Sequence, residues 1–443
     1  MKKFLIMIVF ASAVIYGQGQ TLTLEQTIKI GLENSKTLKI SKSKVIGGDA
    51  KVSEVTSQML PKITLGASYT RLSDVPPFEV NVPIFPAPIK IQDVILNNYN
   101  VKLSLQQPLF TGFRLTSLRS AAESNYEALK GDYNKDANEV ALNIQNAFWN
   151  LYKSQKVLAL VEENLKQLEE HLSDTKKFLD NGLATTNDYL KLEVQYANVK
   201  LMHIESANNV KVAQAALNKL LGYNISDPTE ITAPDIQAGV DEMKYDDLSK
   251  EAVNQREELK STQLRINAGE NALTAAKSTW YPSVFLFGDY YYSRPNQRYM
   301  PTKDEFKDTW DVGVSLNWEL WNWGYNSSQS TQAEQQLIQT QTAYEQIKDN
   351  IELEVYQAYL RTISENDKVE VNKISVQQAE ENYRITSEKY NQQVATSTDL
   401  IDAEVSLLDA KTKLATALVD FQMAKVKLDK AVGRNLTTFE VGK

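Results

Sequence analysis

The stretch from Tyr325 to Gln392 reads YNSSQSTQAEQQLIQTQTAYEQIKDNIELEVYQAYLRTISENDKVEVNKISVQQAEENYRITSEKYNQ, which is 68 residues without a proline or a glycine. As an α-helix rising about 1.5 Å per residue, it would be roughly 100 Å long, several times the diameter of a compact domain. Apolar side chains recur every seven residues, at Leu337, Tyr344, Ile351 and Ala358. The stretch therefore predicts a long helix with a seam for a neighbouring helix.

A second run of this kind extends from Phe113 to Asn181, free of proline and interrupted only by Gly131. The two runs align with an offset of 211 residues, which also places Asp188 on Asp399 and Gly222 on Gly433. This correspondence indicates an internal duplication. Its period is far longer than that of an ordinary solenoid repeat, so each copy must contain several elements.

Shorter helices are expected on either side of each long one. Leading helices are predicted at Leu24 to Met59 and Tyr245 to Ser278, and each is followed by a proline, Pro61 or Pro282. Returning helices of about 35 residues show a strict alternation of fours and threes, starting at Leu192 in one copy and Ala403 in the other. A leading and a returning helix placed end to end would match the length of one long helix.

Residues alternate between apolar and polar after each of these prolines, a pattern typical of strands with two different faces. Four strands are expected, at residues 62–70, 99–106, 284–292 and 310–318, and Phe285 and Phe287 blur the pattern of the third. The segment from Leu72 to Asn98 contains five prolines and predicts a long exposed loop.

The ends of the predicted strands carry aromatic side chains that resemble the girdles of membrane strands. Those at one end are Tyr69, Tyr99, Tyr290, Tyr292 and Trp310, and those at the other are Phe110, Trp318, Trp321 and Trp323. Strands of about ten residues are long enough to cross a bilayer when tilted. Four strands cannot close a barrel, so transmembrane strands would require several chains to share one. Period two is also common in soluble hairpins, which stay the alternative interpretation.

The first twenty residues have the features of a secretory signal: Lys2 and Lys3, an apolar run from Phe4 to Ile15, then small residues. We predict a signal peptide at 1–19, a first repeat at 20–222, a linker at 223–247, a second repeat at 248–433 and a tail at 434–443. The chain has 443 residues, a formal net charge of −8 and no cysteine. An acidic chain is a poor nucleic-acid ligand, and disulfides, thiol catalysis and a lipidated cysteine are excluded.

The motifs described so far resemble the TolC-like outer-membrane efflux factors over nearly the whole chain. The matching features are Leu22 to Glu25 with Asn34, Pro61, Pro108 to Gly112, and the turn from Asn181 to Asp188. The resemblance implies a mainly α-helical homotrimer with a transmembrane β-part: long coiled-coil hairpins form an α-barrel in the periplasm, capped by a 12-stranded β-barrel in the outer membrane. It also implies a passive exit duct for small molecules or proteins, partnered by a periplasmic adaptor and an inner-membrane pump.

The resemblance also assigns residues at the turns between long and returning helices. Asp399 and Asp402 match an acidic ring at the periplasmic gate, and Asp188 and Tyr390 match a link that keeps the gate closed. The expected adaptor-docking turns are Gly182, Leu183, Ala184 and Thr185 in the first copy and Val394, Ala395 and Thr396 in the second. Two positions depart from the family pattern, since Gln393 stands where glycine is usual and Ala395 where some members have arginine. Asp399 and Asp402 could also be ordinary charges at a helix N-terminus.

The remaining residues give no sign of catalysis or of a cofactor. No nucleophile elbow, glycine-rich phosphate loop or metal-ligand spacing is present. The two histidines are His171 and His203, and the latter occupies a seam position filled by Leu414 in the other copy, which indicates a structural role. An exported coiled-coil scaffold without a conduit is the alternative function.

Overall fold

The computed structural model describes residues 21–92, 94–239 and 243–437. The predicted signal peptide and the last residues of the tail lie outside this range. The chain forms two compact units. The helical unit comprises Met1–Ser41, Tyr133–Glu257 and Lys348–Lys443, and the strand unit comprises Lys42–Asp132 and Glu258–Ile347.

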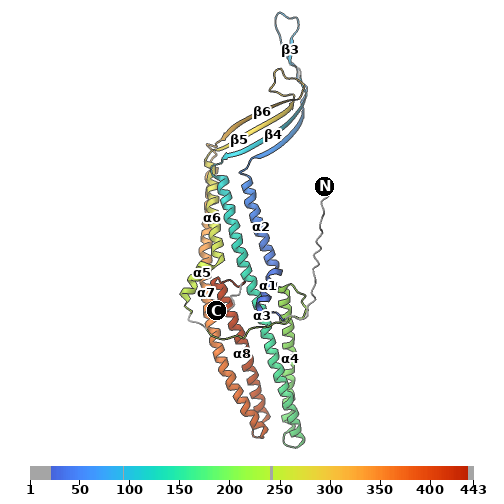
Figure 1. Ribbon diagram of the computed structural model, residues 1–443, viewed down its shortest axis with the longest axis vertical. Coiled ribbons are helices and arrows are strands. Elements are labelled where there is room, and N and C mark those ends of the chain that lie inside the picture. Colours follow the sequence, from blue (N-terminus) through green and yellow to red (C-terminus); the bar gives the residue numbers. More distant parts are fainter. Residues whose placement is uncertain (1–20, 93, 240–242, 438–443) are drawn as a thin grey trace, which may run out of the picture. The chain divides into compact units, whose positions relative to one another are not determined.

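The helices come in the predicted order, twice over (Figure 1). The first copy contains α1 (Leu24–Asn34), α2 (Lys36–Ser57), α3 (Arg114–Asp180) and α4 (Thr186–Leu221). The second contains α5 (Tyr245–Gln255), α6 (Glu257–Lys277), a short 3-10 turn η1 (Ser278–Trp280), α7 (Tyr325–Asn391) and α8 (Ser397–Val432). Both long helices have 67 residues and both returning helices have 36, so the predicted duplication is confirmed at the level of the elements.

Helix ends follow the local sequence. A capping box begins three of the helices, with Thr23, Thr185 or Thr396 as the first residue. The threonine hydroxyl accepts a hydrogen bond from the backbone N–H of the third helical residue. The side chain of that third residue accepts one from the backbone N–H of the threonine. Gly222 and Gly433 end α4 and α8 with φ of 77° and 92°, a left-handed conformation that glycine adopts without strain.

Each leading helix is broken near its first third, which corrects the prediction of single helices at Leu24 to Met59 and Tyr245 to Ser278. Ser35 and Arg256 take extended backbone conformations, with ψ of 120° and 121°, between α1 and α2 and between α5 and α6. The Ser35 hydroxyl accepts from the Leu38 N–H and so caps α2. Neither break contains proline or glycine, the residues that most clearly end a helix in a sequence.

The core of the helical unit joins segments that are far apart in the chain. Ile28 of α1, Phe148 and Trp149 of α3 and Leu217 of α4 are fully buried in one apolar cluster. Leu436 of the tail and Ile231 of the linker contribute to the same cluster. The linker contains no regular strand in its described residues, only a single parallel bridge between Leu22 and Ile231.

Four antiparallel strands form the sheet of the strand unit, in the order β1, β4, β5, β6 (Figure 1). Their bounds are Lys62–Arg71 for β1, Asn97–Phe110 for β4, Ser283–Arg294 for β5 and Lys307–Asn317 for β6. Trp318, expected at the end of the fourth strand, lies one residue beyond it. The segment from Leu72 to Asn98 is more ordered than predicted, because β2 (Phe78–Val80) and β3 (Ile89–Gln92) pair within it as a second, two-stranded sheet.

Candidate functional site

The turns between long and returning helices have the same backbone in both copies. Gly182 and Gln393 take φ of 74° and 63°, and the next residues donate backbone hydrogen bonds of 2.8 Å to Phe178 O and Lys389 O. Glycine adopts this left-handed conformation freely, whereas a residue with a side chain pays roughly 1–2 kcal/mol. The departure from glycine noted in the sequence therefore places a strained residue at the second turn.

Small and apolar side chains of both turns face solvent. Leu183 is 58% exposed and Val394 is 72% exposed, and Gly182, Thr185 and Thr396 are exposed as well. Ala184 and Ala395 are half-buried. The residues assigned to docking thus present a surface without charged groups at each turn.

Asp188 and Asp399 are the third residues of α4 and α8, where they complete the helix caps. The Asp399 carboxylate accepts from the Thr396 N–H at 2.9 Å and from its hydroxyl at 2.7 Å, and Asp188 accepts in the same way from Thr185. Bonding to the threonine hydroxyl, supported by the backbone N–H, lowers the pKa of both carboxyl groups. Both residues are therefore ionised helix caps, and for Asp399 this agrees with the alternative interpretation as a charge at a helix N-terminus.

The two turns also contact each other through polar groups. The side chain of Ser397, buried at the start of α8, helps to lower the pKa of Asp188. Lys191 of α4 donates to the Thr398 hydroxyl of α8 at 3.0 Å. Lys191 thus connects the start of α4 to the start of α8.

Tyr390 bonds to another residue within this chain. Its hydroxyl lies 2.6 Å from the Thr175 hydroxyl of α3, in a buried contact, and its ring packs edge-on against Phe178. Tyr390 therefore fastens α7 to α3 just before the turn. Asp402 is exposed on α8, one turn beyond Asp399.

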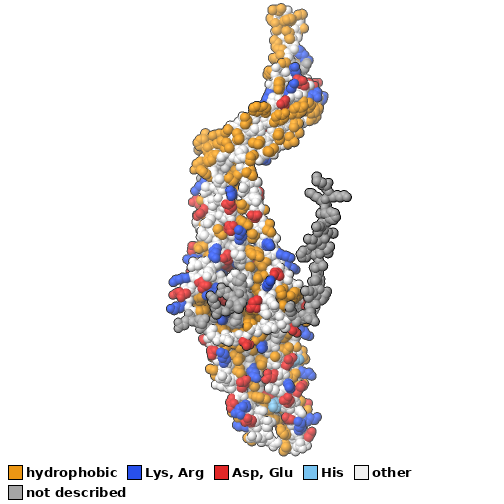
Figure 2. Space-filling model, viewed as in Figure 1, with side chains coloured by type: hydrophobic (Ala, Val, Ile, Leu, Met, Phe, Trp, Pro, Cys, Tyr) orange, Lys and Arg blue, Asp and Glu red, His pale blue; other side chains and the backbone are white. Residues whose placement is uncertain are grey.

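One face of the four-stranded sheet is apolar and faces solvent. Leu65, Leu103, Tyr290 and Trp310 lie opposite one another across all four strands, and Trp310 is 70% exposed. Figure 2 shows hydrophobic side chains gathered over these strands. The predicted girdle residues are also exposed, apart from the half-buried Phe110: Tyr69, Tyr99, Tyr290, Tyr292, Trp310, Trp318, Trp321 and Trp323. A patch of this extent on a sheet marks an interaction surface.

The opposite face of the sheet is polar and carries ion pairs. Lys102 of β4 lies 2.9 Å from Asp289 of β5, and Arg298 pairs with Asp311 of β6. Phe287, which looked misplaced in the alternating pattern, covers Gly313 on the neighbouring strand, where an added Cβ would come within 2.8 Å of its ring. The glycine and the phenylalanine together fill one position of this face.

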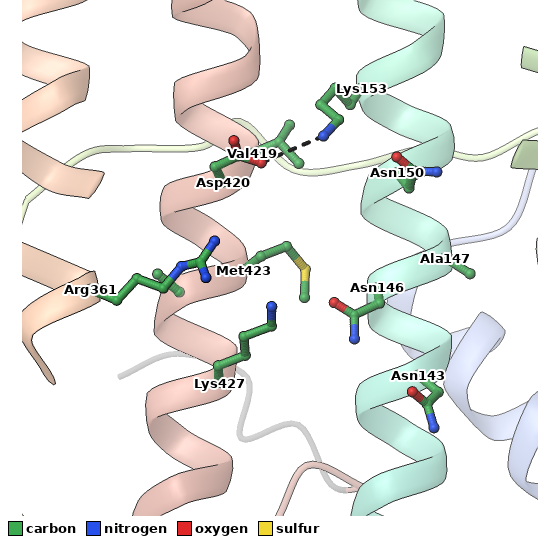
Figure 3. A pocket seen from close by; sticks show the side chains of 11 residues that line it. Asn143, Asn146, Ala147, Asn150, Lys153, Arg361, Val419, Asp420, Met423 and Lys427 are labelled. Atoms are coloured by element: carbon green, nitrogen blue, oxygen red, sulfur yellow. Dashed lines mark ion pairs between the residues drawn. The ribbon is translucent and has the colours of Figure 1, made fainter. Parts of the chain in front are cut away.

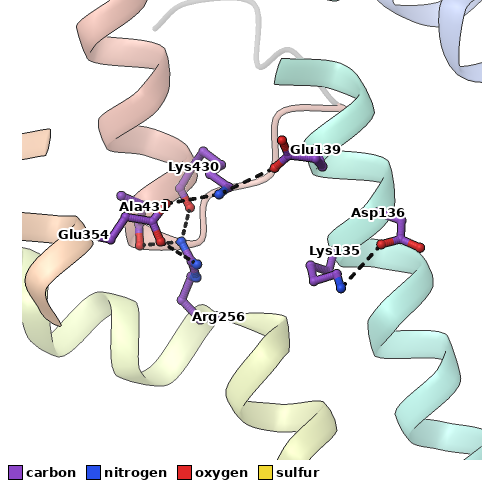
Figure 4. Close-up of polar contacts among 7 residues, drawn as sticks. All are labelled: Lys135, Asp136, Glu139, Arg256, Glu354, Lys430 and Ala431. Carbon is purple, nitrogen blue, oxygen red and sulfur yellow. Dashed lines mark hydrogen bonds and ion pairs between the residues drawn. The ribbon is translucent and has the colours of Figure 1, made fainter. Parts of the chain in front are cut away.

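A charged network stands where α5 meets α8 in the helical unit (Figure 4). Arg256, at the break after α5, donates to the carbonyls of Lys430 and Ala431 at 3.1 Å and to Glu354 of α7 at 2.8 Å. Lys430 also pairs with Glu354 and with Glu139 of α3, at 3.1 and 3.5 Å. Burial acts to raise the pKa of Glu354, but Arg256 and Lys430 outweigh it and lower the pKa below its ordinary value.

A polar cavity of about 450 Å³ lies between α3, α7 and α8 (Figure 3). Asn143, Asn146 and Asn150 line it from one face of α3, and Arg361 and Lys427 extend toward it from α7 and α8. Lys153 and Asp420 face each other across it at 3.5 Å. A lining of amides and charges keeps such a cavity hydrated.

The histidines occupy different surroundings. His203 is half-exposed and lies 3.3 Å from Glu162, so the seam position predicted for it does not bury the ring. His171 lies 3.0 Å from Glu404, a buried residue that the sequence analysis did not single out. Within the described ranges, no three His, Cys, Asp or Glu side chains gather closely enough to hold a metal ion. None of the described helices combines the length and hydropathy needed to cross a bilayer.

Comparison with known proteins identifies the family. A profile described as outer membrane efflux protein matches residues 27–223 and 248–434. The outer membrane protein TolC of Vibrio cholerae is 22% identical over 87% of this chain and 85% of its own length. The alkaline protease secretion protein AprF of Pseudomonas aeruginosa is 20% identical over 76% of this chain and 70% of its own.

A solved structure has the same fold. The outer membrane protein VceC from Vibrio cholerae superimposes with a TM-score of 0.76 at 19% identity, covering 93% of this chain and 96% of that one. The family profile covers both copies of the duplication and leaves out mainly the signal, the linker and the tail. The chain therefore belongs to the outer membrane efflux protein family, and it is an outer-membrane channel protein.

Proposed function

We propose that three copies of this chain form the exit duct of a tripartite efflux or type I secretion system. The observation that supports this most is the four-stranded sheet, which has one exposed apolar face and whose edge strands β1 and β6 are unpaired on their outer sides among the described residues. An open edge in lipid costs several kcal/mol for each unsatisfied backbone group, and about eight strands are the practical minimum for closure. Pairing β6 of one copy with β1 of the next satisfies both edges, and three copies of this four-stranded sheet supply twelve strands.

The same assembly accounts for the two faces of the sheet. The apolar face, with aromatic rings near both ends of the strands, contacts lipid and its interfaces. The polar face, with Lys102, Asp289 and Asp311, lines the water-filled interior. A soluble hairpin domain would instead leave the row from Leu65 to Trp310 in water, at the cost of the hydrophobic free energy of that surface.

The turns at Gly182–Thr185 and Val394–Thr396 receive the periplasmic adaptor of an inner-membrane pump. Their exposed, uncharged side chains suit an apolar docking contact. Asp399 and Asp402 line the periplasmic entrance in three copies each, and Asp188 and Tyr390 hold the surrounding helices. A cap role for Asp399 is compatible with a gate role, because a capping carboxylate keeps its negative charge. The cargo is either small molecules or proteins, and the inner-membrane pump selects it.

The assembly is tested by native mass spectrometry of the detergent-solubilised protein, together with conductance in a planar bilayer. A trimer that conducts is the expected result. A monomer that conducts ions would contradict shared closure of the strands.

The gate is tested in the same bilayer. Six clustered carboxylates attract cations and bind multivalent ones, so the wild-type channel should prefer cations and be blocked by them. Asp402→Ala and the double variant with Asp399→Ala should weaken the block progressively, whereas Asp409→Ala, an exposed position farther along α8, should retain it. Full block in the double variant would place the acidic ring elsewhere.

Docking is tested with charges at exposed turn positions. Gly182→Glu should abolish export, but it also strains the backbone at a φ of 74°. Leu183→Glu and Val394→Glu separate these effects, because they change the surface at ordinary backbone positions. Normal export by both variants with unchanged trimers would show that the adaptor binds elsewhere.

A further inference from the structure

Glu404 of α8 is a buried acid without a well-aligned donor. Its side chain is 2% exposed, and among the described residues neither carboxylate oxygen receives a hydrogen bond of good geometry. Its neighbours a turn away in α8, Leu400 and Leu407, are buried apolar residues. A bare carboxylate in such surroundings is strongly disfavoured, so the site requires a compensating positive charge or a proton.

His171 of α3 is the group placed to provide that proton. Its Nε2 atom lies 3.0 Å from Glu404 Oε1 and 3.2 Å from the hydroxyl of Tyr383 on α7, and its side chain is 15% exposed. The three residues come from three different helices and meet at one nitrogen atom. Burial raises the pKa of Tyr383, and the Glu404 carboxylate raises it further, so the phenol stays protonated.

We propose that Glu404 and His171, with Tyr383, form a buried proton-binding site that joins the first long helix to the second helical hairpin. The bound proton lies on Nε2, facing a carboxylate, or on Oε1, facing a neutral imidazole. Either arrangement leaves the pair without a net charge. Loss of that proton leaves one net negative charge between α3 and α8, without compensation.

Other charged groups near this site are already engaged. Lys411 of α8, two turns farther from the turn, pairs with Glu163 of α3 and Glu380 of α7 at 3.4 and 3.8 Å. Lys191 of α4 donates to Thr398, and Glu170 of α3 is exposed beside His171. Glu170 is also negative and therefore favours retention of the proton. His171 is thus the positive partner available to Glu404.

The site belongs to one copy of the duplication. The counterparts of Glu404 and His171 are Glu193 and Asn382, and both are exposed. The buried Thr175–Tyr390 bond lies one turn of α3 closer to the tip. The proton site therefore continues a line of polar contacts that holds α3 against α7 and α8 near the entrance. When the proton leaves, these helices should separate more easily. This consequence for the duct rests on the proposed function.

The site is tested by thermal unfolding of the purified detergent-solubilised protein between about pH 5.5 and 8.5, a range that brackets the ordinary imidazole pKa of about 6.5. The wild-type Tm should fall as pH rises, by on the order of 2 °C. Glu404→Gln supplies an amide donor without a charge, and it should remove this slope. Glu193→Gln and His203→Gln are matched controls, and they should keep it.

A second measurement shows where in the chain the pH dependence arises. It uses the wild-type protein, so it does not depend on whether a variant folds. Hydrogen exchange of the wild-type protein, corrected for intrinsic rates, should increase above neutral pH in peptides covering residues 165–178 and 400–410, and not near His203. A wild-type Tm and exchange pattern independent of pH, or a slope that persists in Glu404→Gln, overturns the proposal. Both measurements are independent of conductance, so failure of the gate assignment would leave them unchanged.

Discussion

The two places where a leading helix meets a returning helix share a backbone plan and differ in chemistry. At the first, Asn34 donates to the Leu221 carbonyl at 2.8 Å and packs against Gly222. At the second, Arg256 donates to two carbonyls at the end of α8 and to Glu354, and its backbone packs against Gly433. Both copies share the left-handed glycine and the break in the leading helix. The group that caps the carbonyls is a neutral amide in the first copy and a buried cation in the second.

The difference in charge predicts the largest effect. Arg256→Met removes a side chain that is 6% exposed, so the carbonyls of Lys430 and Ala431 lose their guanidinium donor and Glu354 loses one of its two cationic partners among the described residues. Breaking a buried ion pair costs about 3 kcal/mol, whereas Asn34→Ala should cost about 1 kcal/mol. Thermal unfolding followed by circular dichroism in detergent measures both effects. Equal losses of unfolding free energy in the two variants would mean that the charge of Arg256 does not contribute to stability.

Packing of the same short helices predicts the next effect. Gly31 of α1 corresponds to the buried Ala252 of α5, but a Cβ atom at Gly31 would lie 2.4 Å from Ile144 Cδ1. Because Ile144 is fully buried, Gly31→Ala should destabilise by about 2 kcal/mol. Ala252→Gly should cost about 1 kcal/mol, from backbone entropy. A stabilised Gly31→Ala protein would show that Ile144 can move aside.

The turns at the tips give a smaller effect with opposite signs. Gln393→Gly should stabilise the protein by about 1 kcal/mol because it relieves the left-handed conformation, and Gly182→Gln should destabilise it by a similar amount. The unfolding midpoints of the two variants check the prediction, with Gln392→Gly as a control at the preceding turn residue, whose φ is not positive. A destabilised Gln393→Gly protein would indicate that the Gln393 side chain makes a contact in the trimer.

The smallest effect comes from the two capping carboxylates. Their lowered pKa values mean that the caps contribute stability above the unfolded pKa of about 3.9, and that this contribution is lost as pH falls through the folded pKa. Asp399→Asn should therefore lower the Tm at neutral pH and lose this difference in acid. Asp188→Asn should lower it more, since Lys191 and Ser397 also stabilise Asp188. If the Tm of the two variants depended on pH in the same way, the additional interactions of Asp188 with Lys191 and Ser397 would be contradicted.

Most of the fold could be predicted because its signals are local. At three of their four ends, α3 and α7 differ from the predicted runs by one residue, and at the fourth they agree. A run without proline, in which Gly131 is the single glycine, continues as helix until Gly182 or Gln393 turns the chain. The short strands β2 and β3 were missed because prolines surround them. The break at Ser35 carries a capping residue as a weak local signal, whereas the break at Arg256 depends on the carbonyls of α8, which no local pattern reveals.

The candidate site was predictable to a smaller degree. The turns and their caps follow from Gly182, Asp188 and Asp399, so their positions were clear from the sequence. Glu404 was missed because it lies beside Ala403, a seam position, and looks like a flanking charge of a two-helix coiled coil. Only the packing of α3 and α7 against that flank makes it buried. Whether a flanking residue is covered by a third helix is a tertiary property, which heptad spacing does not encode.

The apolar cluster that joins Leu22 to Leu436 has a consequence for how the chain is made. Leu22 lies near the start of the described chain and Leu436 near its end, so the cluster needs residues from almost the whole sequence. The helical unit can therefore complete its core only when nearly all of the chain has been made. A truncated product lacking Leu436 would leave this core unfilled and should be cleaved by proteases more readily than the full chain.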